Sequence, residues 1–454
     1  MSVEAGGLVL RAEPYVHVLA QKERGQRCDF CLNRQTELRR CSSCKLLRYC
    51  NITCQKSDWS IHKEECRCLQ QVSPRIPMDS VRLLFRLIIR HERGDSTRHV
   101  DVDPSWRTFS QFQSHSKEIA GDSKRARTFS EMMFTLNKMA GSIFKLPDTS
   151  KIFEMFGKMT INSFSICDGE MQPIGVGIYL SPSLLDHKCQ PNAVVTFTGK
   201  TLEVRALQAL PEVSPNNVYI SYIDQLAPSS ERRRQLEEQY YFTCDCSRCT
   251  DEDLDHLMSS FKCPQGGCSG FVYMDNDSVM SSCNECRSSP ESSYVSKLKN
   301  IGIYSLEQLS KIDEEKKNGS TENIMEICKG CLSKQEALMG PQNINMVRVL
   351  DRAFDAAIDL EIWDQALAYG KRTIEPYLHI YPPGSPNVGV QLMKIGKIQL
   401  YLQELGDALV SLHKARSILR LTHGKLHPIY KDLVELLDQC AEEKRHNLQA
   451  LRMS

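Results

Sequence analysis

Residues 28 to 66 carry eight potential metal ligands in the pattern Cys28-x2-Cys31-x9-Cys41-x2-Cys44-x5-Cys50-x3-Cys54-x7-His62-x3-Cys66. These four close pairs offer enough thiolate and imidazole ligands for two tetrahedral zinc sites. The residues between the pairs are too polar to bury a core, so metal binding must supply the free energy of folding. A disulfide cluster is the alternative interpretation, and the absence of a visible export signal disfavours it.

The composition of the chain limits its class. It has 454 residues, 41% of them apolar, which predicts about three globular domains. The formal net charge of +1 argues against a strongly basic nucleic-acid binder, so we expect DNA binding to be weak or absent. No long apolar stretch suggests a membrane span. Twenty cysteines without an export signal indicate reduced thiols that hold metal, in a protein of the cytoplasm and nucleus.

Hydrophobic periodicity divides the rest of the chain. Residues 78–157 have helical spacing around an irregular polar stretch, and short β-rich runs follow at 174–179, 194–197, 201–204 and 218–222. The tripeptide 198–200 between two of these runs reads as a hairpin turn, and a charged helix is expected from Pro228 onward.

The chain is predicted to be helical from residue 294 to its end, with an internal repeat. Trp363 and Leu405 begin similar segments 42 residues apart, and Pro386 and Pro428 have the same separation. Two helix pairs of equal length predict a tetratricopeptide-like stack with a long period. A helical bundle without true repeats is the alternative.

A second cysteine group consists of Cys244, Cys246 and Cys249. Tetrahedral zinc needs a fourth ligand, for which the isolated Cys189 is the best candidate, although spacing alone leaves open that it is a buried thiol.

A third group, Cys263-x4-Cys268 followed by Cys283-x2-Cys286, predicts a small zinc ribbon. Cys328 and Cys331 are interpreted as half-buried thiols in a helix.

Five motifs in the middle of the chain resemble a SET domain followed by its post-SET cysteines. They occupy residues 162–166, 175–179, 184–192, 218–222 and 240–249. The ligand-rich segment 28–66 resembles a MYND finger. In this order, and with a helical C-terminus, the chain is similar to the SET-and-MYND lysine methyltransferases over nearly its whole length, apart from the ribbon.

The resemblance implies an α+β, multi-domain fold: a split SET β-fold with an inserted MYND finger, a post-SET zinc site, a small ribbon and a tetratricopeptide-like helical domain. The expected segments are an N-terminal SET strand region (1–27), the finger (28–66), a helical insertion (67–157), the core SET (158–227), the post-SET cluster (228–250), the ribbon (259–290) and the helical domain (294–454).

The resemblance also implies how the ligands are shared. In such fingers the pairs interleave, and Cys66 is favoured over Cys68 as the last ligand. Three zinc sites are expected, and the ribbon adds a fourth. The ligand sets are Cys28, Cys31, Cys50 and Cys54; Cys41, Cys44, His62 and Cys66; Cys189, Cys244, Cys246 and Cys249; and Cys263, Cys268, Cys283 and Cys286.

The activity implied is methyl transfer from S-adenosylmethionine to a protein lysine, with donor and lysine entering from opposite faces of a narrow channel. Tyr222 and Tyr240 would line the channel, Tyr222 as the catalytic hydroxyl, and Phe164 would form part of its wall. The residues implied to bind the donor are Asn162, Ser183, Leu185, Asp186, His187, Tyr222 and Phe242, the last against adenine.

The sequence departs from the family pattern in three places. The family's Gly-x-Gly loop is expected to precede the strand that residues 4–11 resemble, and we find no counterpart of it here. Asp186 stands where the family has Asn, and its carboxylate would repel the carboxylate of the donor. Losing such a contact costs about 1–3 kcal/mol. The Gly-Glu-Glu turn before the last SET strand is replaced by residues 215–217, which also suit a turn.

Two functions remain open at this stage. The first is a lysine methyltransferase that acts, as a monomer, on histone or non-histone proteins. The second is a binding scaffold with a degenerate SET core, whose finger binds proline-rich or other peptides in extended form.

Overall fold

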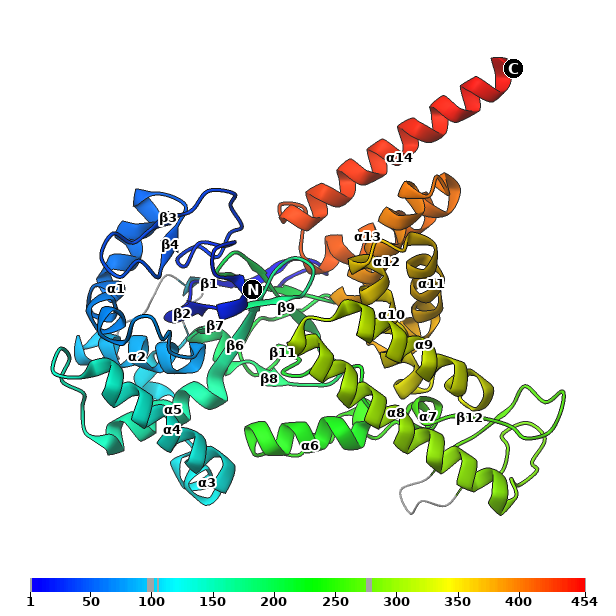
Figure 1. Ribbon diagram of the computed structural model, residues 1–454, viewed down its shortest axis with the longest axis horizontal. Coiled ribbons are helices and arrows are strands. Elements are labelled where there is room, and N and C mark those ends of the chain that lie inside the picture. The colour runs from blue at the N-terminus through cyan, green and yellow to red at the C-terminus, as the bar shows by residue number, and fades with distance from the viewer. Residues whose placement is uncertain (1, 96–101, 104–105, 275–279, 454) are drawn as a thin grey trace.

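The computed structural model describes residues 2–95, 102–103, 106–274 and 280–453 (Figure 1). Residues 96–101 and 104–105 of the predicted helical insertion, and 275–279 of the predicted ribbon, lie outside this description. None of the described helices is long and apolar enough to cross a membrane.

Small antiparallel sheets form the centre of the molecule. One has the strand order β2-β7-β6 and another the order β5-β1-β10-β9, while β11 and β8 form a parallel pair. The strands are β1 (Leu8–Ala12), β2 (Val16–Leu19), β5 (Val102–Asp103), β6 (Ser163–Cys167), β7 (Pro173–Ile178), β8 (Asp186–His187), β9 (Ala193–Thr198), β10 (Thr201–Ala206) and β11 (Tyr219–Ile220).

Strand pairing brings the first residues of the chain against residues far along it. Arg11 pairs with Glu203 in the β1–β10 ladder, and Val16 pairs with Ile178 in the β2–β7 ladder. The finger and the helical insertion are therefore placed between the two halves of one β-structure, which confirms the predicted split fold.

The predicted hairpin turn at 198–200 joins β9 to β10, whose first pair is Thr201 with Thr198. Gly199 at its tip has φ +58°, and a Cβ there would lie 2.4 Å from the carbonyl oxygen of Cys31. Only glycine fits this combination of left-handed backbone and close approach. The turn therefore fixes where the finger meets the sheet.

The finger contains a short hairpin and a long helix, and it packs on the helical insertion. Its elements are β3 (Arg39–Arg40), β4 (Arg48–Tyr49) and α1 (Ile52–Val72), and those of the insertion are α2 (Asp79–Glu92), α3 (Ser116–Gly121), α4 (Ser123–Ala140) and α5 (Thr149–Asn162). Residues from both parts share one hydrophobic core, including Leu69, Leu84 and Phe85. Burial of this apolar surface joins the two parts.

Helices make up most of the C-terminal half. They are α6 (Ser229–Tyr240), α7 (Glu252–Met258), α8 (Ser292–Asn318), α9 (Thr321–Leu338), α10 (Ile344–Asp359), α11 (Trp363–Ile380), α12 (Pro386–Tyr401), α13 (Leu405–Thr422) and α14 (Pro428–Met453), with the short strands β12 (Phe261–Lys262) and β13 (Phe271–Val272) ahead of α8. Helices α8 to α13 stack side by side, and α14 projects from the stack (Figure 1).

The predicted repeat coincides with these helices. Trp363 and Leu405 are the first residues of α11 and α13, and Pro386 and Pro428 are the first residues of α12 and α14. Proline suits the first turn of a helix because its missing N–H has no partner there. The repeating unit is therefore a pair of helices.

Hydrogen bonds fasten the helical domain to the core at several points. His427 Nε2 lies 2.9 Å from the carbonyl oxygen of Phe197, and the Tyr381 hydroxyl donates to Asp224 at 3.1 Å. The buried guanidinium of Arg248 donates to the carbonyl oxygens of Gln225, at 2.9 Å, and of Ile380. Asp224 and Gln225 follow Tyr222 closely, so this interface supports the segment that carries the predicted catalytic tyrosine.

Candidate functional site

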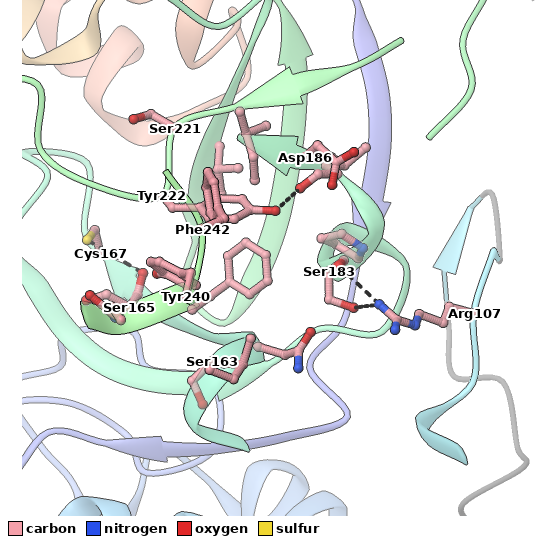
Figure 2. A pocket seen from close by; sticks show the side chains of 18 of the residues that line it. Arg107, Ser163, Ser165, Cys167, Ser183, Asp186, Ser221, Tyr222, Tyr240 and Phe242 are labelled. Carbon is pink, nitrogen blue, oxygen red and sulfur yellow. Dashed lines mark hydrogen bonds between the residues drawn. The ribbon is translucent and has the colours of Figure 1, made fainter. Parts of the chain in front are cut away.

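A cavity of about 500 Å³ lies where β6, β8, β11 and the end of α6 converge. All the aromatic residues predicted for the site line it, namely Phe164, Tyr222, Tyr240 and Phe242. Figure 2 shows Tyr222, Tyr240 and Phe242 in its middle, Arg107 and Ser183 at one end, and Cys167 and Ser165 at the other. The cavity thus extends to either side of the aromatic group.

The parallel pairing of β11 with β8 places Tyr222 beside His187. Ile220 is the register partner of His187, and the chain then bends so that the Tyr222 N–H donates to His187 Nδ1 at 3.0 Å. Nδ1 therefore acts as an acceptor, and the ring's proton is assigned to Nε2. Burial, aided by the charge of Arg232, lowers the pKa of His187 to about 4, which keeps this imidazole neutral at physiological pH.

Tyr222 and Tyr240 face one another with ring centroids 4.9 Å apart. Phe242 lies edge-on to Tyr222 at 6.4 Å. Burial is the main cause that raises the pKa of Tyr222 above its ordinary value, and it raises the pKa of Tyr240 to about 12. Both phenols are therefore neutral at physiological pH, and each can donate a hydrogen bond.

The hydroxyl of Tyr222 donates to the carbonyl oxygen of Leu185 at 2.6 Å. This bond holds the phenol in the wall of the cavity. Phe164 on β6 packs edge-on against the buried Tyr179 at 5.7 Å, so its ring is also fixed by the core behind it. The lysine-channel residues proposed from the sequence thus line one cavity.

All the residues predicted to surround the methyl donor line the cavity, except His187. Asn162 ends α5, where its side chain donates to the Lys158 carbonyl at 2.8 Å. Ser183 donates to the Leu180 carbonyl at 2.6 Å. Asp186 is exposed at the cavity wall. His187 does not line this cavity but a smaller one of about 340 Å³ next to it, with Tyr222 and Phe242 between the two.

Sequence reasoning missed Arg107. Its guanidinium donates to the carbonyl oxygen and to the hydroxyl of Ser183, each at 3.2 Å, and burial lowers its pKa. Arg107 lies in a polar stretch without periodicity, so no sequence signal placed it near residue 183. It supplies a positive charge at the end of the cavity that contains Asp186.

The post-SET cysteines and Cys189 come together behind the aromatic group. The four Sγ atoms of this group lie within 4.8 Å of one another, and those of Cys189 and Cys249 are 3.4 Å apart. Tetrahedral Zn–S bonds of about 2.3 Å require sulfurs about 3.8 Å apart, so the spacing fits one zinc ion. His187 Nε2 lies 3.2 Å from Cys189 Sγ, so this imidazole stands between the predicted metal site and Tyr222, whose N–H donates to it.

The finger residues form two interleaved groups, as the resemblance implied. Cys28, Cys31, Cys50 and Cys54 form one, and Cys41, Cys44, His62 and Cys66 form the other, each within 4.8 Å. Cys68 is buried but belongs to neither group among the described residues. Sulfur and imidazole donors at this spacing suit zinc.

A buried ion network supports the second group. His62 Nε2 faces Cys44 Sγ at 3.6 Å, while its Nδ1 lies 3.3 Å from Glu65. Arg82 and Arg86 of α2 donate to Glu65 at 2.8 Å and 2.7 Å, and Arg86 also pairs with Asp58 at 3.0 Å. A carboxylate behind a ligating histidine fixes its tautomer and orientation. Here that carboxylate also ties the finger to the helical insertion.

The ribbon cysteines form a fourth group. Cys263, Cys268, Cys283 and Cys286 lie within 4.8 Å of one another. A Cβ on Gly270 would lie 2.5 Å from Cys283 Sγ, so this glycine permits the close approach of the two knuckles. Cys328 and Cys331 are fully buried in the core beneath the ribbon, and within the described part of the chain neither joins a group of ligands.

Comparison with known proteins agrees with this geometry. The family model of the MYND finger matches residues 28–66. The histone-lysine N-methyltransferase SMYD3 of Homo sapiens is 35% identical over 96% of this chain and 92% of its own length. The N-lysine methyltransferase SMYD2-A of Danio rerio is 28% identical over 96% and 93%, and the histone-lysine N-methyltransferase ASHR1 of Arabidopsis thaliana is 29% identical over 98% and 93%.

These relatives match the chain from the β-structure through the finger to the helical domain. A relative of this identity and coverage shares the fold, and the four ligand groups and the split β-structure agree with it. The chain therefore belongs to the SMYD family of SET- and MYND-domain proteins.

Proposed function

We propose that the protein is a lysine methyltransferase that uses S-adenosylmethionine and acts on lysines of other proteins, histones or non-histone proteins. The observation that carries the proposal is the cavity around Tyr222, which extends to both sides of the aromatic group. The family relationship supports the same chemistry, because the relatives named above are lysine methyltransferases.

The two sides of the cavity suit the two reactants. Ser183 and Asp186, with Arg107, offer polar and charged groups for the amino-acid and ribose parts of the donor, and Phe242 offers a ring for adenine. Cys167, Met171, Val195 and Phe197 also line the cavity, with Ser165 beside Cys167. These apolar side chains suit the aliphatic stem of a lysine.

When bound, S-adenosylmethionine supplies a methyl group on a sulfonium that a neutral amine can attack in line. The chain must then align the amine, keep it neutral and exclude water. A rigid group of aromatic rings aligns the reactants, which can contribute several kcal/mol. The same rings disfavour a charged ammonium, because burial stabilises the neutral form of an amine.

Tyr222 and Tyr240 act as positioning hydroxyls and not as bases, because both phenols hold their protons at physiological pH. The carbonyl oxygen of Leu185 already accepts from Tyr222. The reacting amine can therefore be oriented by oxygen atoms whose own positions are fixed. The proton released from the incoming ammonium leaves toward solvent before the attack.

The four Cys and His groups are proposed to hold structural zinc. Each group offers four soft donors and leaves no coordination position for water. This is typical of structural zinc sites, whereas catalytic sites keep one position open. The group that contains Cys189 is the one on which the cavity depends, since it contacts His187.

Calorimetry of the full chain with S-adenosylmethionine tests the proposal. We expect saturable binding of one donor per chain, and substitution of Phe242 by Ala weakens it. Absence of binding up to about millimolar donor, where the free energy of binding is only about 4 kcal/mol, would contradict the proposal.

A second function has separate support in the finger. On α1, Ile52 and Trp59 expose 56% and 41% of their surface beside the metal ligands. An exposed aromatic residue next to an apolar one suits a proline-rich peptide in extended form. Fluorescence anisotropy of a labelled polyproline peptide tests this binding, and a Trp59→Ala variant that binds equally well argues against it.

A further inference from the structure

The helical domain carries a second cleft that faces the catalytic core. This cleft has a volume of about 580 Å³ and is formed by α8, α10, α11 and α12 on one side and the β6–β7 turn on the other. We call it the aromatic cleft, and its key residues are Trp363, Tyr401, Asp355, Asp359, Lys394 and Lys397.

An aromatic pair forms one wall of the cleft. Trp363 begins α11 and Tyr401 ends α12, and their rings lie 5.3 Å apart at an angle of 53°. Tyr401 is 66% exposed, although burying a side chain of this size would be worth about 2 kcal/mol. Two rings inclined to each other, Tyr401 exposed and Trp363 half-buried, offer π-faces to a cation or a planar group.

The charged residues of the aromatic cleft differ in whether they form an ion pair. Lys394 pairs with Asp355 at 3.2 Å, and Lys397 pairs with Glu170 of the turn at 3.4 Å. Among the described residues Asp359 has no ion-pair partner within 4.0 Å; burial and the nearby charge of Asp355 raise its pKa, and the charges of Lys316 and Lys394 oppose this rise. Lys316 also lines the cleft, in the last turn of α8, where its charge is favourable to the helix C-terminus.

The position of the cleft relates it to the catalytic cavity. Glu170 and Gln172 line the aromatic cleft, whereas Met171 between them lines the cavity that contains Tyr222. Successive Cα atoms are about 3.8 Å apart, so the two openings lie on either side of one tight turn. A polypeptide whose lysine occupies the cavity can reach the cleft with a residue a few positions away.

We propose that the aromatic cleft binds an arginine side chain of the substrate polypeptide, a few residues from the lysine that is methylated. A guanidinium can stack on Trp363 and Tyr401 and donate to the Asp359 carboxylate at the same time, which the compact ammonium of lysine does less well. The inference rests on the proposed function and adds a sequence preference to it.

The test uses the full chain and short fluorescein-labelled peptides. Each peptide has one lysine in a background of Gly, Ser and Ala, and a single arginine is moved through the flanking positions. Parallel series carry glutamate or norleucine at these positions. Fluorescence anisotropy without donor measures binding, and methyl transfer with S-adenosylmethionine measures kcat/KM.

We expect arginine at one or two positions to tighten binding and to raise kcat/KM about three- to fivefold. Trp363→Ala and Tyr401→Ala should abolish this advantage without changing the transfer to peptides that lack arginine. Tyr401→Phe keeps the ring and should keep the advantage. Phe134→Ala is the matched control, because Phe134 is a similarly exposed aromatic residue, 67% exposed, on the distant α4.

Two results would overturn the inference. The first is that the peptides bind with equal affinity wherever the arginine is placed. The second is that the glutamate peptides bind more tightly, which would mean that the lysines of the cleft bind an acidic partner. If no peptide and no protein is methylated while arginine peptides still bind through Trp363 and Tyr401, the proposed function fails and the binding site stands.

Discussion

The hydroxyl of Tyr222 donates a hydrogen bond of 2.6 Å to the backbone carbonyl of Leu185. This bond joins the segment after β11 to the segment before β8, and these segments carry the two predicted halves of the site. The phenol keeps its proton because burial raises its pKa. We therefore propose that Tyr222 positions groups in the cavity and does not remove a proton from the substrate.

Replacement of Tyr222 by Phe should lower kcat at least about 100-fold, because the variant keeps the ring and loses only the fixed hydroxyl. Its donor affinity should change by less than about threefold, as the hydroxyl already binds to Leu185. Calorimetry and a methyl-transfer assay measure the two quantities. Unchanged kcat would show that the hydroxyl has no part in the reaction.

Asp186→Asn should increase affinity for S-adenosylmethionine. The substitution removes the repulsion between two carboxylates and restores a hydrogen-bond donor, a change of about 1–3 kcal/mol or roughly 5- to 150-fold in Kd. Calorimetry of the wild type and the variant at the same ionic strength measures the two Kd values. Weaker binding by the variant would mean that Asp186 contributes through a different partner, with Arg107 the nearest cation in the cavity wall.

The protein as purified should contain zinc in all four groups of ligands. Cys189→Ser should lower the zinc content by about one ion per chain and abolish methyl transfer, because Cys189 contacts His187 beside the cavity. Elemental analysis measures the loss. As a control, Cys286→Ser in the exposed ribbon should remove a similar amount of zinc with little effect on donor binding, and an equal loss of donor binding would contradict this separation.

Arg86→Met should destabilise the fold by about 3–5 kcal/mol, because it removes the ion pair of the buried Asp58 carboxylate and leaves Glu65 with Arg82 as its only arginine partner. The midpoint of urea denaturation of the finger and core reports the effect. Arg127→Met is the matched control, since the Arg127–Glu131 pair is exposed and should contribute less than about 1 kcal/mol. Similar midpoints for the two variants would argue against the network.

Acid should weaken the contact between the helical domain and the core. Burial lowers the pKa of His423 to about 3, whereas an unfolded histidine has a pKa of about 6.5. The neutral ring's contribution is fully present above pH 6.5 and is lost as the pH falls from there toward 3, by about 1.4 kcal/mol per pH unit. His423→Gln should therefore show a smaller fall in melting temperature between neutral and mildly acidic pH. A parallel fall in both proteins would contradict this assignment.

The four groups of metal ligands could be predicted from the sequence, because cysteine and histidine residues at such spacings have few roles other than metal binding. Even Cys189, far from its partners in the chain, could be nominated from the missing fourth ligand. The helix pairs were also predictable, since their period and proline positions repeat. Contacts between residues far apart in the sequence could not be predicted. Arg107 reaches Ser183 from an irregular loop, and Trp363 contacts Tyr401 only because α11 and α12 are antiparallel neighbours. The Glu65–Arg86 pair was hidden because charged residues in amphipathic helices usually face solvent.

Methyl transfer itself tests the central claim most directly. The full chain is incubated with S-adenosylmethionine carrying an isotopically labelled methyl group and with purified histones and a mixture of other purified proteins, and labelled residues are located by mass spectrometry. The account predicts labelled lysine with the wild type and a loss of at least about 100-fold with Tyr222→Phe. Absence of labelled lysine with wild-type protein that binds the donor, or equal labelling by the Tyr222→Phe variant, would contradict it.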